Sequence, residues 1–125
     1  MKTKEQISSF LEKWVHDTGL AWWKVDAFWH TGKEARKFFK SDKDTTVIAR
    51  TFSDWRYGEV AIHFNLPAMK GFSVEEIERT IVHELCHALI NEMRAGGIDH
   101  EERVVTGLAK AFIWVRNFAK DERNV

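Results

Sequence analysis

Five consecutive residues, His83-Glu84-Leu85-Cys86-His87, constrain this chain more than any other segment. In an α-helix, residues four apart project from one face, so the imidazoles of His83 and His87 can bind one metal ion together. Glu84 follows His83 directly and can reach a water molecule on that metal. If the segment is helical, the pattern therefore indicates metal-assisted hydrolysis of an amide bond.

The residues around these five have the signature of one long helix. Ser73, followed three residues later by Glu76, forms a capping box that begins a helix. Gly96-Gly97 ends a helix at low energetic cost. Between them, apolar residues cover nearly every side of the helix: Ile77, Ile81, Val82, Leu85, Ala88, Leu89, Ile90 and Met93. The sequence therefore predicts a buried helix over residues 73–95.

Burial of this helix leaves two histidines and a glutamate in need of partners, because unpaired polar groups are costly to bury. A shared metal ion is the favoured partner. The alternative is a set of hydrogen bonds, with Glu84 paired to Arg79 or Arg94. A zinc hydrolase also needs a third protein ligand and an open position for water.

Three candidates for the third ligand, His100, Glu101 and Glu102, stand at the start of a second predicted helix. That helix is indicated by apolar residues at helical spacing: Val104, Val105, Leu108, Ala109, Phe112 and Val115. A turn at Gly96-Gly97 would fold it back against the first helix. The apolar stripe places Glu101 nearer its centre than Glu102, and Glu102 also completes a capping box with Asp99. The residues alone leave the choice of ligand open.

From the five-residue motif to the second helix, the sequence resembles the H-E-x-x-H…E pattern of gluzincins, zinc peptidases related to thermolysin. The resemblance covers residues 22–119 as a pattern, and residues 80–109 carry its specific motifs. In size the chain is similar to the minigluzincins and to the minimal zincin peptidases of phages and prophages. Its second helix resembles the E-x-E-A-x-x-F-A helix of the anti-repressor peptidases of mobile elements. That alignment implies Glu102 as the third ligand, and Val104 stands where those proteins have a glutamate.

The resemblance implies one Zn²⁺ per chain, held by His83, His87 and Glu102. A water bound to this metal would have a pKa lowered towards about 7. Glu84 would accept the proton of that water and pass it to the leaving amine. Carboxylates should orient the ligating histidines, and those nearest in sequence are Asp99 and Glu101.

A further donor usually stabilises the oxyanion of such a reaction. The candidates in this sequence are His100, Tyr57 and His63, and each has an alternative structural role.

The remaining pattern predicts one α+β domain over residues 1–125, similar to a small zincin. It would contain an N-terminal helix, a three-stranded antiparallel or mixed sheet, the active-site helix and a C-terminal ligand-bearing helix. The predicted ranges are a helix over 4–16, a loop with a possible helical turn over 31–45, a turn over 53–56, and strands over 20–30, 46–52 and 57–65. In zincins an edge strand above the metal pairs with the substrate. The strand over 57–65 is a candidate for that role, or is an ordinary sheet member.

Composition restricts the environment and the partners. The chain has 19 basic and 19 acidic residues, so its zero net charge gives no reason to expect nucleic-acid binding. It contains neither an apolar signal region nor a run long enough to span a membrane. The single cysteine, Cys86, cannot form an intramolecular disulfide. We therefore expect a cytoplasmic protein, of a bacterium or of a phage-infected cell, with neither nucleic acid nor membrane as a partner.

Together these features predict a zinc metallopeptidase that acts on peptides or proteins, an endopeptidase rather than an exopeptidase. The alternative is a zinc-binding regulatory or protein-interaction module whose peptidase activity is latent or lost. A nucleic-acid-associated zinc protease is disfavoured by the zero net charge. The substrate and the oligomeric state are not specified by the sequence.

Overall fold

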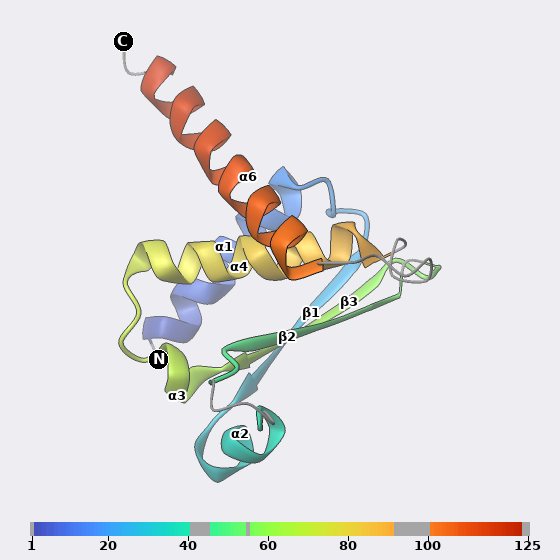
Figure 1. The fold of residues 1–125 in the computed structure, drawn as a ribbon, viewed down its shortest axis with the longest axis vertical. Coiled ribbons are helices and arrows are strands. Elements are labelled where there is room, and N and C mark those ends of the chain that lie inside the picture. Colours follow the sequence, from blue (N-terminus) through green and yellow to red (C-terminus); the bar gives the residue numbers. More distant parts are fainter. Residues whose placement is uncertain (1, 41–45, 55, 92–100, 124–125) are drawn as a thin grey trace.

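Figure 1 shows the fold in a computed structural model, which describes residues 2–40, 46–54, 56–91 and 101–123. Within these ranges, five helices accompany a three-stranded sheet, so the predicted α+β class is confirmed. The elements in chain order are α1 (Lys2–Asp17), β1 (Lys24–His30), α2 (Gly32–Phe38), β2 (Ala49–Asp54), β3 (Glu59–Asn65), α3 (Leu66–Met69), α4 (Val74–Leu89) and α6 (Glu101–Arg123).

The sheet is mixed, with strand order β1-β3-β2. β1 runs parallel to β3, and β2 runs antiparallel to it, with Thr51 opposite Ile62. Of the two alternatives for the strand over residues 57–65, the edge strand is therefore wrong, and β3 is an ordinary sheet member that is paired on both sides. The short hairpin joins β2 to one side of β3, which leaves the other side of β3 for β1. The edge strand beside α4 is β2.

The turn of this hairpin lies later than predicted. β2 continues through Asp54, and the chain reverses just before Gly58, whose φ of +62° is a conformation that glycine adopts without strain. Arg56 donates to the carboxylate of Asp54 and helps to hold the turn. After β3, Leu66-Pro67 ends the strand as predicted and begins the short helix α3.

The helices α1 and α4 form a layer over one face of the sheet, and α6 crosses α4 on the side away from α1 (Figure 1). Alternation along β3 directs Val60, Ile62 and Phe64 into this layer, where all three are buried. They meet the buried face of α4, which includes Ile77, Ile81 and Leu85, and the buried face of α1, which includes Ile7, Leu11 and Trp14. The helix α4 is therefore held rigidly between the sheet and two other helices.

The start of α4 matches the sequence pattern. The Ser73 hydroxyl accepts a hydrogen bond from the Glu76 backbone N–H at 3.1 Å, so Ser73 is the N-cap. The end of the helix differs from the prediction, because α4 ends at Leu89 rather than at residue 95. Ile90 leaves the helical conformation and buries its side chain, while Leu89 is left 38 % exposed. The Gly96-Gly97 turn lies outside the described residues.

No helix in the described ranges combines the length and the apolar character that a membrane crossing requires.

Candidate metal centre

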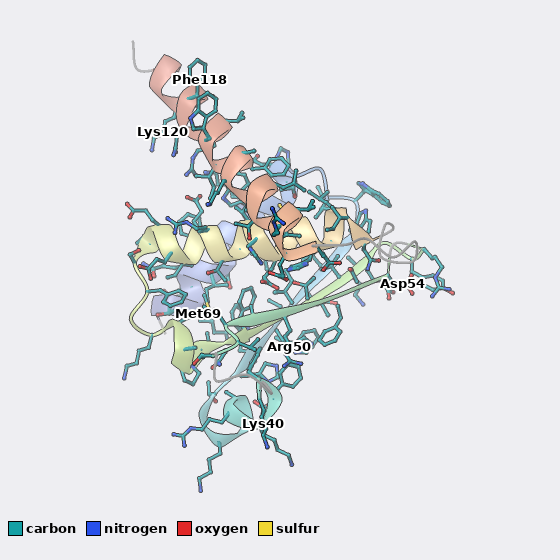
Figure 2. All side chains as sticks on the ribbon, viewed as in Figure 1. Lys40, Arg50, Asp54, Met69, Phe118 and Lys120 are labelled. Carbon is teal, nitrogen blue, oxygen red and sulfur yellow. The ribbon has the colours of Figure 1, made fainter. Side chains whose placement is uncertain are left out.

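The described part of the structure brings together three side chains of α4 and two from the first turn of α6. The α4 residues are His83, Glu84 and His87, and the α6 residues are Glu101 and Glu102. They line one wall of a cavity of about 690 Å³, and residues 47–52, which include most of β2, form another wall. In Figure 2 the side chains of this region lie where the base of α6 crosses α4 above β2. The predicted site residues therefore share one cleft.

The carboxylate of Glu102 spans the two histidines. Its Oε2 lies 3.1 Å from the Nε2 of His83, and its Oε1 lies 3.0 Å from the Nε2 of His87. The two Nε2 atoms and this carboxylate therefore face the same small volume. The Glu102 side chain is 72 % exposed, so the site remains open to solvent on that side.

Glu101 contacts His87 from the other side of the imidazole ring. Its Oε2 lies 2.8 Å from the Nδ1 of His87, and its side chain is only 17 % exposed. The apolar stripe of the sequence correctly predicts that Glu101 is the more buried of the two glutamates. A carboxylate on Nδ1 fixes the tautomer and the orientation of the ring, and it leaves Nε2 available for a metal.

The chemistry and the spacing of these groups fit a zinc ion. Zinc binds imidazole nitrogen and carboxylate oxygen at about 2.0–2.2 Å, so two of its tetrahedral ligand atoms lie about 3.4 Å apart. The two Nε2–carboxylate distances, 3.0 and 3.1 Å, are within a few tenths of an ångström of that separation. The ligand atoms of His83, Glu84 and His87 also lie within 4.8 Å of one another. Small side-chain movements would therefore suffice to place a metal.

Glu84 is buried at the floor of the cleft, with 7 % of its surface exposed. The Thr51 hydroxyl donates a 2.7 Å hydrogen bond to its Oε1. Burial raises the pKa of Glu84 above its ordinary value, because a charged carboxylate is poorly solvated there. The hydrogen bond from Thr51 and the charges of His87 and His83 oppose this increase only in part. A carboxylate with a raised pKa and a fixed orientation is suited to accept and return a proton.

Thr51 was not identified from the sequence. It lies on the face of β2 that looks towards α4, and its contact with Glu84 depends on the register of β2 against β3. The only signal in the sequence is the alternation of Ala49, Thr51 and Ser53, three small residues on one face of β2. That pattern does not reveal which helix residue the hydroxyl meets.

Two of the suggested oxyanion donors do not lie in this cleft. His63 is on the opposite face of the sheet, where its Nδ1 lies 2.8 Å from the Nε2 of His30 and its ring stacks on Phe28 and Phe38. Tyr57 is 72 % exposed at the hairpin turn. The alternation of side chains along β3 explains the position of His63, since its neighbours Ile62 and Phe64 occupy the core face. His100 and Asp99 lie outside the described residues.

Arg79 lies near the five-residue motif and Cys86 within it, but neither is part of the group of histidines and glutamates. Arg79 lines the cleft but makes no ion pair with Glu84 within the described ranges, and Arg94, the other suggested partner of Glu84, lies outside the described residues. Cys86 is fully buried among apolar residues, and burial raises the pKa of its thiol to about 12. Cys86 is therefore a core residue.

No family model, curated protein or solved structure matches this chain. The resemblance to gluzincins thus stays a prediction from the sequence. A functional assignment depends on the geometry and the chemistry of the cleft.

Proposed function

We propose that this protein is a zinc-dependent metallopeptidase that hydrolyses peptide bonds in the cleft between α4 and β2. One observation carries the proposal. The carboxylate of Glu102 spans the Nε2 atoms of His83 and His87, while the buried carboxylate of Glu84 lies beside them. Two histidines and a carboxylate with a neighbouring acid–base group are the donor set of a hydrolytic zinc site.

Each residue of the cleft has one role in this proposal. His83, His87 and Glu102 hold the metal. Glu101 orients His87 through its contact with Nδ1. When bound, the zinc supplies a Lewis acid that polarises the peptide carbonyl and increases the acidity of water.

Glu84 moves the proton. Its Oε1 is engaged by the Thr51 hydroxyl, whereas its Oε2 has no hydrogen bond to the described part of the chain. Oε2 would take a proton from the attacking water and deliver it to the nitrogen of the leaving amine. Thr51 holds the carboxylate in the orientation that both transfers need, so it is a positioning residue.

The edge strand β2 suits an extended peptide. One side of β2 pairs with β3, and its other side has no strand partner among the described residues. Residues of β2, including Ala49, Thr51 and Phe52, line the cleft. A substrate backbone can add to such an edge through main-chain hydrogen bonds, which select extended and unfolded segments rather than a particular side chain. A cleft beside an exposed strand favours an endopeptidase.

The test is cleavage of an unfolded protein such as casein by the zinc-loaded chain and by Glu84→Gln. We expect turnover by the wild type and a loss of roughly 10²- to 10⁴-fold in Glu84→Gln, as is typical when a general acid–base group is removed. Bound zinc, measured by mass spectrometry, should be unchanged, because Glu84 is not one of the three ligands. Glu75→Gln is the matched control, since Glu75 is exposed on the first turn of the same helix.

Two results would redirect the proposal. Undiminished turnover in Glu84→Gln would contradict the assigned role of this residue. Stoichiometric zinc without turnover in the wild type would instead support a zinc-binding regulatory module with latent or lost activity.

A further inference from the structure

The outer face of α6 is rich in exposed apolar side chains. Trp114, Val115 and Phe118 are 65 %, 59 % and 52 % exposed, and the rings of Trp114 and Phe118 stack with their centroids 5.4 Å apart. The C-terminal turns of α6 extend away from the other elements, and Phe118 points outward from them (Figure 2). An exposed cluster of this size on a small domain marks an interaction surface.

The spacing of this face is that of a coiled coil. Val104, Gly107, Ala111, Trp114 and Phe118 follow one another at intervals of three, four, three and four residues. We call these five residues the outer seam. A separate stripe on the same helix, which includes Val105 and Ala109, is already buried against the core. The outer seam is therefore not needed for the fold and is available to a second helix.

The outer seam has a recess as well as projections. A hollow on α6 is lined by Glu102, Arg103, Thr106, Gly107 and Lys110. A Cβ atom added at Gly107 would meet nothing within 4 Å, so the surface there is open. The helix thus carries a recess at its base and an aromatic projection two turns later.

We propose that the outer seam binds a second copy of this chain, with the two α6 helices antiparallel about a two-fold axis near Ala111. With a rise of about 1.5 Å per residue, Trp114 lies about 4.5 Å beyond the axis and Gly107 about 6 Å before it. An antiparallel two-fold axis brings Trp114 of one helix to within about 1.5 Å of the height of Gly107 on the other. Trp114 and the recess also lie on the same side of the outer seam. The two-fold axis keeps that side in common, so Trp114 of one copy and the recess of the other lie on the same side of the interface. Each copy would therefore insert Trp114 into the recess of the other.

The charges around the recess favour an aromatic guest. Arg103 and Lys110 flank Gly107, and neither forms an ion pair within the described ranges. A guanidinium or ammonium group is attracted to the face of an indole ring, more strongly than to phenylalanine. Arg103 and Lys110 would therefore attract the exposed indole of Trp114, which is the aromatic group that a second copy of α6 brings to the height of the recess.

The area predicts a weak, reversible dimer. An aromatic side chain buries about 150–250 Å² when fully covered. From each copy, Trp114 and Phe118 are about half exposed and give roughly 150–250 Å², so with Val104 and Val115 the two copies together bury roughly 600–800 Å². That area is below the range of stable interfaces and is typical of a weak, transient one. We expect a dissociation constant in the micromolar range. The inference does not rest on the proposed peptidase activity, although Glu102 lines the recess and would lie beside the partner's Trp114.

Sedimentation equilibrium of the full chain over a concentration series tests the dimer. The wild type should pass from monomer to dimer between about 1 and 100 μM, and Trp114→Arg should remain monomeric throughout. Gly107→Leu adds a side chain to the recess, at a position where the new Cβ atom meets nothing within 4 Å, and should also remain monomeric. Trp22→Arg is the matched control, because Trp22 is 76 % exposed far along the chain from α6, and it should associate like the wild type.

Cross-linking tests the orientation. In an antiparallel pair, position 107 faces position 115, so a mixture of Gly107→Cys and Val115→Cys chains should form a disulfide-linked heterodimer under mild oxidation. Either variant alone should not, whereas a parallel pair would cross-link each with itself. Cys86 will not interfere, because it is buried and burial raises the pKa of its thiol to about 12. A monomeric wild type at 100 μM, or unchanged association in Trp114→Arg, would overturn the proposal.

Discussion

At the scale of single residues, Glu101 and Glu102 are neighbours in sequence with different surroundings. Glu102 is exposed and faces the Nε2 atoms of both histidines, whereas Glu101 is partly buried and contacts the Nδ1 of His87. Two adjacent residues on a helix point about 100° apart, so one turn of α6 can supply a ligand and an orienting carboxylate together. Replacing Glu101 and replacing Glu102 should therefore have different effects on zinc binding.

We expect Glu102→Gln to lose bound zinc and Glu101→Gln to retain it with an affinity reduced by about 10- to 100-fold. The first variant removes a charged ligand, and the second removes only the group that orients His87. Zinc competition with a chromophoric chelator measures both affinities, and Glu75→Gln again serves as the control. Equal losses in the two variants would contradict this division of roles. A loss confined to Glu101→Gln would move the ligand to Glu101.

Cys86 provides a second test at the residue scale. Its thiol is fully buried, and the pKa of about 12 leaves almost no thiolate at pH 8. Iodoacetamide should therefore modify Cys86 in urea but not in the native protein, even though the residue stands between the two histidines in sequence. Mass spectrometry after timed quenching measures the rates. Fast native labelling would contradict the position of Cys86 in the core.

At the scale of the elements, an ion pair fastens α6 to the rest of the molecule. The Arg116 guanidinium donates to both oxygens of Glu78 on α4, at 2.6 and 2.8 Å, and the Trp14 indole of α1 donates to the same carboxylate at 2.8 Å. Glu78 is 7 % exposed, so its charge depends on these partners. Three helices are thereby joined at one point. This contact fixes the direction of α6, whose first turn carries Glu101 and Glu102.

Replacing Arg116 with alanine should lower the free energy of unfolding by about 2–4 kcal/mol at pH 7. The substitution leaves a buried carboxylate with only the Trp14 donor, and breaking a buried pair of this kind is strongly destabilising. The lower part of the range reflects the partial exposure of Arg116, whose side chain is 24 % exposed. Urea unfolding measures the change. Lys120→Ala, an exposed cation on the same helix, is the control and should be close to neutral.

The same ion pair predicts an acid dependence of stability. Burial by itself would raise the pKa of Glu78, but the hydrogen bonds from Arg116 and Trp14 and the Arg116 charge outweigh it, so this pKa is lowered from 4.5. The unfolded chain then binds the proton more tightly than the folded protein. The stabilisation is complete above about pH 4.5 and is lost as the pH falls through the folded pKa. The difference in the free energy of unfolding between wild type and Arg116→Ala should therefore become smaller from pH 7 to pH 3.5. A difference that stays constant would argue against this ion pair.

Local patterns in the sequence were sufficient to predict most elements of the fold. The N-cap at Ser73 and the alternation of β3 depend on neighbouring residues, and both are found where expected. The strand order was not predictable in the same way, because β3 is central only through its pairing with β1, which precedes it by more than thirty residues. For the same reason, the sequence did not identify β2 as the edge beside the cleft.

In the candidate site too, local features could be predicted from the sequence and contacts between distant elements could not. His83, Glu84 and His87 share one helix, so their proximity follows from helical spacing alone. Thr51 and Arg116 act across elements, and their partners Glu84 and Glu78 depend on the packing of β2 and α6 against α4. The placement of His63 on the far side of the sheet likewise follows from the register of β3, about which the five-residue motif on α4 gives no information.

At the scale of the whole molecule, the candidate metal site draws on residues of three separate elements. Its residues come from α4 and from the first turn of α6, and Thr51 of β2 contacts Glu84. A ligand that binds only the folded state stabilises that state by mass action, by about 2.7 kcal/mol when its free concentration is 100 times its dissociation constant. For a domain of 125 residues, this amounts to an increase of roughly 10 °C in the midpoint of thermal unfolding.

We therefore expect zinc to raise the melting temperature of the chelator-treated wild type by about 10 °C, as measured by calorimetry at pH 7. Glu102→Gln should show no such increase, because the ion would lose the carboxylate that spans both histidines. Glu84→Gln should show the full increase, since that residue lies beside the metal without holding it. The pair of variants separates binding from catalysis by stability alone, without any substrate. An increase in Glu102→Gln equal to that of the wild type would mean that zinc stabilises the protein at some other place, and the centre described above would not be its site.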